Sequence, residues 1–241
     1  MHGGRVYHVL GATGAVGATL CHRLRAEGAR LLISGRNEAQ LCALAAEIGA
    51  EAMAVDAAHA EQVAAAVDRT VSVYGRLDGA VNCVGSLLLK PAHLTTDGEW
   101  RQAIAQSLDS AFYLIRSAVK RMNGEGGSIV LVSTAARVGL ANHEAISAAK
   151  AGLIGLALSA ASSYAARRIR VNCVVPGLLD AALRAKIMGL EASRRVSDMM
   201  HLLRRPEEIA KAVSWLLSAE QSWVTGQLLG VDGALASARP V

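Results

Sequence analysis

The sequence predicts a single α/β domain, in which about seven parallel strands form a doubly wound sheet with helices on both faces. Short runs of β-branched residues alternate with longer alanine-rich segments along nearly all of the 241-residue chain. The strand-like runs are apolar throughout, as expected of strands buried on both faces of a parallel sheet. The sequence shows no repeat, linker or low-complexity tract, so residues 1–241 are expected to form one domain.

The individual elements follow from the same alternation. We expect strands at residues 5–10, 29–34, 51–56, 77–82, 127–133, 169–175 and 227–231. We expect helices at residues 15–28, 38–48, 59–74, 97–122, 144–166 and 206–218. Asn37 is suited to cap the second helix, and Gly49 follows its end. Residues 178–205 have mixed polarity and are expected to form a mobile cap over the substrate.

Composition limits the possible functions. Apolar residues make up 52% of the chain but aromatic residues only 3%, so the core must consist of Ala, Val, Leu and Ile. The net charge of +5 is mildly basic, and no dense Lys/Arg run with interleaved aromatic residues is present. We therefore expect no nucleic-acid partner. No stretch of about 18 uncharged apolar residues occurs, so we expect no membrane span.

Cysteine usage and the amino terminus suggest a compartment. Cys21, Cys42, Cys83 and Cys173 are scattered and form no CxxC pair. We interpret them as buried free thiols of a reducing environment. The first residues contain too short an apolar run for a signal peptide. The expected compartment is the cytoplasm.

A glycine-rich loop joins the first strand to the first helix. Gly11, Gly14 and Gly17 recur every third residue in "VLGATGAVG". Such glycines allow a tight turn and bring backbone N–H groups close to a phosphate at a helix N-terminus. The position of the loop after a strand and before a helix strengthens this interpretation. The pattern predicts a Rossmann-type dinucleotide site.

The end of the second strand indicates which dinucleotide binds. A ribose with a free 2′-hydroxyl favours Asp or Glu at this position, but here Gly35 and Arg36 follow the strand. A guanidinium can bind a 2′-phosphate through two hydrogen bonds. Arg36 therefore favours NADP(H), and a solvated surface arginine is the alternative.

Further landmarks complete a recognisable order. Asp56 closes the third strand, and "NCVG" (Asn82 to Gly85) follows the fourth. Ser133 ends the fifth strand, and Lys150 follows in the next helix. Pro176 and Gly177 end "VNCVVPG", and residues 204–234 form a long C-terminal signature. In this order the chain resembles the short-chain dehydrogenase/reductase family, from about residue 6 to residue 233.

The resemblance implies an NADP(H)-binding oxidoreductase and a set of cofactor-binding residues. The expected set is Gly11, Thr13, Gly14, Ala15, Val16, Gly17, Ser34, Arg36, Asn37, Asp56, Ala57, Asn82, Cys83, Val84, Gly85, Lys150, Pro176 and Gly177. Within this set Ala15 occupies the position of the family's middle glycine. The phosphate loop is therefore expected to differ in detail from that of the family.

The catalytic positions depart further from the family. The family uses Ser, Tyr and Lys with a supporting Asn, and the Tyr hydroxyl transfers the proton. Ser133 and Lys150 match, but Ile146 stands in place of the Tyr and Ser107 in place of the Asn. An aliphatic side chain cannot donate a proton, so the usual proton path is missing.

Other residues can be considered as the proton donor. His143 lies seven residues before Lys150, where the enoyl-reductase branch of the family has its catalytic Tyr. Imidazole titrates near neutral pH and can act as a general acid. The alternative is that His143 is a surface residue at a helix start. His93, His201 and Lys150 itself remain further candidates.

Basic residues gather near the expected cap. They include Arg184, Lys186, Arg194, Arg195, Arg204 and Arg205, with Arg167, Arg168 and Arg170 before the sixth strand. Family reductases that act on carrier-protein thioesters present such residues at the site mouth. An acidic carrier, a coenzyme A thioester or another anionic substrate is one interpretation, and solvated charges are the other.

Two functional classes remain open from the sequence. One is an NADP(H)-dependent oxidoreductase with an atypical proton donor, acting on a carbonyl or an activated alkene. The other is a catalytically silent cofactor-binding subunit or sensor that pairs with an active relative. The resemblance also implies a dimer or tetramer, formed through the helices at 97–122 and 144–166.

Overall fold

The structure is a computed structural model and describes residues 2–122, 124–134, 137, 139, 141–177 and 206–232. The expected cap at 178–205 lies outside the described residues, so its conformation stays a prediction.

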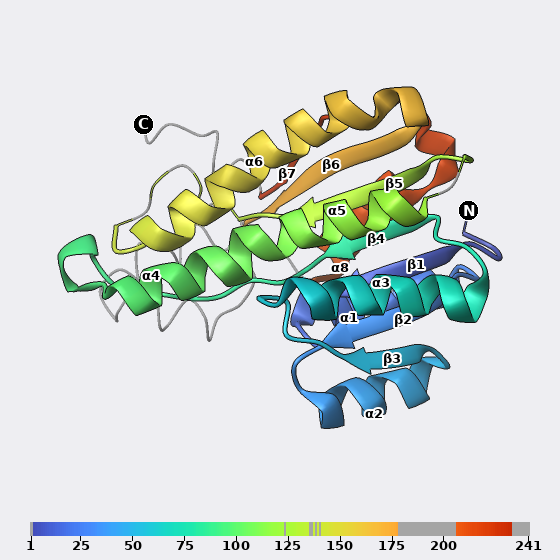
Figure 1. The fold of residues 1–241 in the computed structure, drawn as a ribbon, viewed down its shortest axis with the longest axis horizontal. Helices are drawn as coiled ribbons and strands as arrows, with labels where there is room; N and C mark the ends of the chain where they lie inside the picture. Colours follow the sequence, from blue (N-terminus) through green and yellow to red (C-terminus); the bar gives the residue numbers. More distant parts are fainter. Residues whose placement is uncertain are drawn as a thin grey trace.

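A parallel sheet forms the centre of the domain (Figure 1). Its strands are β1 (Val6–Leu10), β2 (Arg30–Gly35), β3 (Glu51–Ala54), β4 (Gly79–Asn82), β5 (Gly127–Val132), β6 (Ile169–Pro176) and β7 (Leu228–Val231). The seven strands run in the order β3-β2-β1-β4-β5-β6-β7, and every pair is parallel. The predicted fold class is confirmed.

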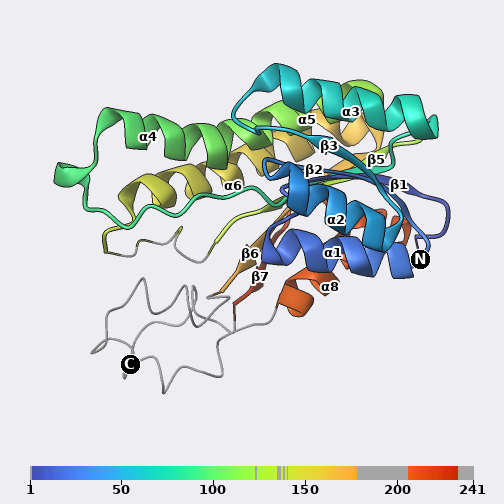
Figure 2. The ribbon, with the colours of Figure 1, turned by 90° about the horizontal axis from the view of Figure 1, so that it is seen from below.

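Helices cover both faces of the sheet, as Figure 2 shows from below. One face carries α3 (Ala60–Tyr74), α4 (Asp97–Ile104), α5 (Ser110–Arg121) and α6 (Glu144–Tyr164), and the other carries α1 (Ala15–Ala26), α2 (Glu38–Ile48) and α8 (Pro206–Leu217). Successive strand residues point to opposite faces. In β5, Ile129 therefore joins the core beneath α3, α5 and α6, whereas Val130 joins the core beneath α1 and α8.

The strand order places a crevice at one edge of the sheet. β1 pairs with both β2 and β4, so the chain winds outward to β3 and then returns to the other side of β1. At such a reversal the loops after neighbouring strands leave in opposite directions, and ligands bind at the carboxyl ends of the strands. Leu10 at the end of β1 pairs with Ser34 on one side and Asn82 on the other.

The helix predicted at 97–122 is interrupted. α4 and α5 are joined by a π-helical segment, η2 (Ala105–Asp109), rather than by continuous α-helix. The Ser110 hydroxyl donates to the carbonyl oxygen of Gln106 at 2.7 Å, which competes with regular backbone hydrogen bonding. A π-helical turn inserts an extra residue and rotates the side chains around it. Gln106 and Ser107, both in η2, are buried as a result.

The second helix has the predicted ends. The Asn37 side chain accepts a hydrogen bond from the Gln40 backbone N–H, and Gly49 adopts the left-handed conformation after the helix. The four cysteines are free, but they are not all buried as expected. Cys42 is exposed, because Leu41, Leu44 and Ala45 form the buried side of α2.

The longest helix resembles a membrane span in composition only. Residues Glu144–Arg167, which include α6, are long and apolar enough to cross a membrane. However, Ala149, Leu153 and Ala157 of α6 are buried within the domain. Leu153 and Ala157 belong to the core cluster beneath α3, α5 and α6. The apolar character of α6 is therefore explained by its packing within the domain.

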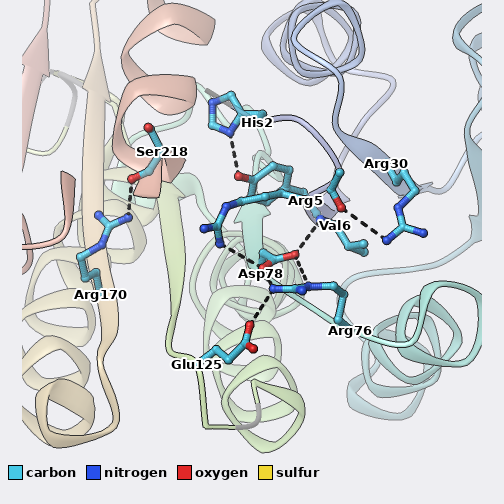
Figure 3. Close-up of polar contacts among 11 residues, drawn as sticks. His2, Arg5, Val6, Arg30, Arg76, Asp78, Glu125, Arg170 and Ser218 are labelled. Carbon is cyan, nitrogen blue, oxygen red and sulfur yellow. Dashed lines mark hydrogen bonds and ion pairs between the residues drawn. The ribbon is translucent and has the colours of Figure 1, made fainter. Parts of the chain in front are cut away.

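The amino ends of the strands are joined by buried and partly buried polar contacts (Figure 3). Asp78, just before β4, accepts hydrogen bonds from Arg5, Arg76 and the backbone N–H of Val6. Nearby, the Arg170 guanidinium donates to the backbone carbonyls of Leu216, Val224 and Ser218. These contacts fasten the start of β1, β4 and β6 to the surrounding loops.

Candidate functional site

A pocket of about 330 Å³ lies at the carboxyl ends of β1 to β4. Its walls come from the segments that follow these four strands, together with one residue from η2 and one from α2. The lining residues are Leu10, Gly11, Thr13, Gly14, Gly35, Arg36, Asn37, Gln40, Val55, Asp56, Ala57, Cys83, Val84, Gly85 and Gln106. Much of the predicted cofactor site is thus brought together in one pocket.

Two of the three loop glycines are required by close backbone packing. Gly11 has a φ of +84°, and a Cβ there would lie 2.9 Å from the backbone N of Val84. A Cβ on Gly17 would overlap the carbonyl oxygen of Gly11. Gly14 is different, since a Cβ there would meet only an ordinary contact. It is exposed at the N-cap of α1, where the first helical N–H groups lack intrahelical partners.

Arg36 lies at the rim of this pocket. It is exposed and lines the pocket beside Asn37. Among the described residues the Arg36 guanidinium has no ion-pair or hydrogen-bond partner. Its charge is therefore available to a bound anion, and no carboxylate in the pocket is paired with it.

The pocket ends at the loop after β3. The Asp56 carboxylate accepts the backbone N–H of Ala58 at 3.1 Å, and the Asp56 N–H donates to Gln62 at 2.8 Å. These bonds fix the carboxylate and the following Ala57 in the pocket wall. Cys83, Val84 and Gly85 line the same pocket from the loop after β4.

Several predicted cofactor residues do not line this pocket. They are Ala15, Val16, Gly17, Ser34, Asn82, Lys150, Pro176 and Gly177. Two of them hold the surrounding loops in place. The Ser34 carbonyl accepts the N–H groups of Gly11 and Ala12, and the Asn82 side chain accepts the N–H of Val84. A direct role of these eight residues in cofactor binding stays a prediction.

Ser133 and Lys150 lie together, beyond this pocket. The Ser133 hydroxyl donates to the Lys150 carbonyl at 2.9 Å. The Lys150 ammonium donates to the carbonyls of Val84 and Val132, both at 2.9 Å. Burial lowers the pKa of Lys150 to about 8. The amine also faces Gly85, where an added Cβ would lie 3.6 Å away, so it lies just behind the pocket wall.

Ile146 belongs to a small apolar cluster. It is buried with Ala103 of α4 and Ala145, and Leu88 packs against the three. The position where the family's proton donor is expected from the sequence is thus surrounded by apolar side chains, and its loss as a donor stays a prediction. None of the four described residues of this cluster carries a titratable side chain.

Ser107 lies in η2 and is buried. Its hydroxyl is 3.2 Å from the hydroxyl of Ser86, which follows the loop after β4. Ser86 lines a second pocket of about 320 Å³, between that loop and α4. This pocket adjoins the first, because both are lined by Arg36, Gly85 and Gln106.

His143 caps the start of α6 but is not a surface residue. Only 5% of its surface is exposed, so the simple surface alternative is wrong. Its Nδ1 lies 2.7 Å from the carbonyl oxygen of Ala141, and since a carbonyl only accepts, Nδ1 must carry the proton. In the neutral ring Nε2 is then an acceptor. His143 can donate a proton from Nε2 only as the imidazolium.

The other sequence candidates lie elsewhere. His93 is exposed in the short helix η1 (Ala92–Leu94). His201 and the basic residues at 184–205 lie outside the described residues. Arg167, Arg168 and Arg170 lie at the amino end of β6, the opposite end of the sheet from the pocket. Their expected place at the site mouth is wrong, because Arg167 and Arg168 precede this parallel strand and Arg170 is its second residue, which places all three at its amino end.

Sequence reasoning missed several residues of this region, among them the polar residues Gln40, Ser86 and Gln106. Gln40 and Gln106 line the first pocket, and Ser86 bonds Ser107. Gln40 was predictable from its place one turn after Asn37. Gln106 was not, because the π-helical turn that places it in the wall has no clear sequence signal.

Comparison with known proteins agrees with this geometry. A family model described as Enoyl-(Acyl carrier protein) reductase matches residues 11–235. The chain is 36% identical to cis-4-hydroxycyclohexanecarboxylate dehydrogenase of Sinomonas cyclohexanicum, over 95% of both chains. It is 30% identical to the 3-oxoacyl-(acyl-carrier-protein) reductase FabG of Thermotoga maritima, over 96% of this chain and 98% of that protein.

A solved structure gives the same result. The structure of a short-chain type dehydrogenase/reductase from Mycobacterium ulcerans superposes with a TM-score of 0.92 and 29% identity. The alignment covers 99% of this chain and 92% of that one. With the glycine loop, the strand order and the Ser133–Lys150 pair in place, the chain belongs to the short-chain dehydrogenase/reductase family of oxidoreductases.

Proposed function

We propose that this protein is an NADP(H)-dependent oxidoreductase with an atypical proton donor. The observation that carries the cofactor assignment is Arg36, an unpaired guanidinium at the rim of the glycine-loop pocket. A 2′-phosphate matches an arginine with no competing carboxylate partner. The pocket volume of about 330 Å³ suits the adenosine half of a dinucleotide.

Each part of the pocket has a proposed role in holding the cofactor. The glycine loop and the N-terminus of α1 bind the diphosphate, Arg36 the 2′-phosphate, and Asp56 and Ala57 the adenine. Lys150 binds the nicotinamide ribose after exchanging a carbonyl partner for a hydroxyl. The bound nicotinamide supplies or accepts the hydride, and Ser133 orients the substrate oxygen.

The proton must take a route that does not involve Ile146. Lys150, whose carbonyl accepts from Ser133, and His143 are the two proposed donors. Lys150 has a pKa of about 8 and lies behind the pocket wall, so at neutral pH it holds a proton that it can release. His143 must first be protonated at Nε2. A rate that falls as pH rises through about 8 and loses that dependence in Lys150→Met supports Lys150. Loss of turnover in His143→Ala supports His143.

Relatives suggest the substrate class. One relative is named for a hydroxylated cyclohexane carboxylate and another for a 3-oxoacyl thioester of acyl carrier protein. We propose that the substrate of this chain is a secondary alcohol, the matching ketone or an activated alkene, with a carboxylate or thioester group. Purified protein should be screened with ketones that carry a carboxylate and with 3-oxoacyl thioesters.

The cofactor proposal is tested by titrating the protein with NADPH and NADH while following nicotinamide fluorescence. We expect micromolar NADPH affinity and at least tenfold weaker NADH binding. Arg36→Leu should remove the preference for NADPH over NADH by weakening NADPH binding about tenfold. Arg101→Leu, an exposed helix arginine outside the pocket, should change neither. Equal binding of the two cofactors would contradict the role of Arg36.

The second candidate function is a silent cofactor-binding subunit. It is favoured by Ile146, which fills the donor position with buried hydrocarbon. On this alternative no carbonyl is turned over by the natural protein, and Ile146→Tyr creates weak reductase activity. Turnover by the natural chain, with NADPH consumed and alcohol formed, rules the silent subunit out.

We further propose a cytoplasmic homodimer or homotetramer, or a mixed assembly with an active relative. Phe112 of α5 and Leu158 of α6 are exposed large apolar side chains on the two helices expected to form the contact. Light scattering of the purified protein tests this. A monomer at micromolar concentration would contradict the homo-oligomer.

A further inference from the structure

Gln106 is a buried polar residue whose side chain has no described partner. Only 7% of its surface is exposed. Its backbone carbonyl oxygen accepts a hydrogen bond from the Ser110 hydroxyl. Its side-chain amide makes no hydrogen bond with any residue that the structure describes. Leaving a buried amide unpaired costs free energy, so such groups normally have partners.

The amide opens into the cofactor pocket. Gln106 lines both the pocket at the ends of β1 to β4 and the adjoining pocket beside α4. The amide atoms are not among the fully enclosed, unpaired polar atoms of the described chain, which are Arg23 Nε and Arg137 Nε. They can therefore reach a ligand in the pocket. The missing partner is expected to be part of that ligand.

The surrounding residues indicate which part of the cofactor lies there. The phosphates belong at Gly11–Gly14, and the 2′-phosphate belongs at Arg36. The remaining wall is formed by Asp56 and Ala57 after β3, and by Val84 and Gly85 after β4. This is the place of the adenine base, and Gln106 completes its wall from η2.

Adenine can present one hydrogen-bonding edge to Asp56 and Ala57 and another to Gln106. The Asp56 carboxylate can accept from the N6 amino group, and the Ala57 N–H can donate to N1. The second N6 proton and the N7 acceptor then remain. A glutamine amide matches this N6/N7 edge with one acceptor and one donor.

We propose that Gln106 is a specificity-determining residue that hydrogen-bonds the N6 and N7 atoms of the cofactor's adenine. The inference rests on the proposed function, since it places the dinucleotide in this pocket. It also explains why a polar residue stands in the buried wall of η2. The π-helical turn is what points Gln106 toward the base.

The test measures binding of ADP and IDP by calorimetry, so it does not depend on enzyme activity. Hypoxanthine in IDP presents acceptors at both O6 and N7, so the amide can form only one of its two bonds. We expect Gln106→Met to weaken ADP about tenfold and IDP at most about threefold. The matched control is Gln102→Met, one turn away on α4, which lines only the adjoining pocket and should leave both affinities unchanged.

The outcomes separate this inference from the proposed cofactor. Unchanged ADP affinity in folded Gln106→Met overturns the inference while the dinucleotide site stands. Equal weakening of ADP and IDP overturns the base contact, since it indicates the ribose instead. If Gln106→Met does not fold, Gln106→Asn keeps an uncharged amide but is one methylene shorter, and it should still weaken ADP binding severalfold.

A further ligand isolates the 2′-phosphate. Wild-type protein should bind 2′,5′-ADP more tightly than ADP, and Arg36→Leu should equalise them. If wild type binds ADP without preferring 2′,5′-ADP, the NADP(H) proposal fails but the Gln106 inference stands. If wild type binds neither nucleotide, both fail.

Discussion

The two ends of the sheet are built for different purposes. At the amino ends of the strands, charged side chains are paired with one another or with backbone carbonyls, as Arg5, Arg76 and Arg170 show (Figure 3). At the carboxyl ends, Arg36 and Gln106 have no described protein partner and line a shared pocket. Satisfied polar groups hold a structure together, whereas unsatisfied groups at a pocket indicate a ligand.

This contrast is informative because a pocket alone would mislead. The cavity at the amino end is about 530 Å³, larger than the 330 Å³ pocket of the glycine loop. Yet Arg5, Asp78 and Arg170, which line it, already bond to other protein groups. By volume, the cavity at the amino end would be the better candidate ligand site. The unpaired polar side chains instead favour the pocket at the carboxyl ends. We therefore expect substitutions at the amino end to change stability and those at the carboxyl end to change binding.

The largest expected effect is on stability, at Asp78. Asp78→Ala removes the acceptor of Arg5, Arg76 and the Val6 N–H. We expect the free energy of unfolding to fall by about 2–3 kcal/mol, because the buried Val6 N–H loses its acceptor. Arg5 and Arg76 are more than a third exposed, so their guanidinium groups can be hydrated and add less to the loss. Urea unfolding measures this. NADPH affinity at a temperature where the variant is folded should remain unchanged.

The control for Asp78 is an exposed carboxylate. Asp97 pairs with Arg101 across one helical turn, and both side chains are largely exposed. Asp97→Ala should change the free energy of unfolding by less than about 0.5 kcal/mol. A loss equal to that of Asp78→Ala would mean that burial of the carboxylate does not matter.

The next largest expected effect is on the pH dependence of stability, and it comes from His8 in β1. His8 is fully buried and hydrogen-bonds Thr70 and Ser34, and the Ser34 carbonyl holds the glycine loop. Burial lowers the pKa of His8 to about 4, below the ordinary value of 6.5. As pH falls below 6.5 the unfolded chain takes up the proton first. Stability is therefore lost between about pH 6.5 and pH 4, and the loss levels off below.

The free energy of unfolding should fall by about 2 kcal/mol between pH 7 and pH 4.5 because of His8. Urea unfolding at the two pH values should show this loss in the natural protein in excess of that in His8→Leu. His8→Leu also removes the hydrogen bonds of His8 to Thr70 and Ser34, but both hydroxyls keep backbone partners, and neither bond loss depends on pH in that variant. An identical pH dependence of the two proteins would show that His8 does not contribute.

A smaller effect should distinguish two glycines of the same loop. Gly17→Ala places a methyl group against the carbonyl of Gly11 and should cost about 2 kcal/mol of stability. The displaced loop should also bind NADPH more weakly. Gly14→Ala meets no close atom, so its stability should change by less than about 0.5 kcal/mol. Thermal unfolding of the pair measures the difference, and equal destabilisation would contradict the close packing of Gly17.

The sheet and most helices could be predicted from the sequence, because their signals are local. Apolar runs such as 169–175, the Asn37 cap and the glycine loop each specify their own structure. The interruption of the helix at 97–122 could not be predicted. The Ser110 hydroxyl donates to the Gln106 carbonyl at this point, and the sequence alone does not specify that contact.

The site was predictable where strand ends define it, and less so where helices do. Gly11, Arg36, Asp56 and Gly85 follow directly from the strand order. Gln106 depends on the π-helical turn, and the enclosure of His143 depends on tertiary contacts around the start of α6. Such positions are set by packing between distant segments, which a single sequence does not display.

The most direct test of the contrast is amide hydrogen exchange, measured by mass spectrometry with and without NADPH. We predict slower exchange in peptides that cover residues 11–17, 55–58 and 83–86, and no change at residues 3–6 and 76–79. Protection confined to the amino end of the sheet, beside the larger cavity, would contradict the account. It would mean that the dinucleotide does not bind where the unpaired side chains are.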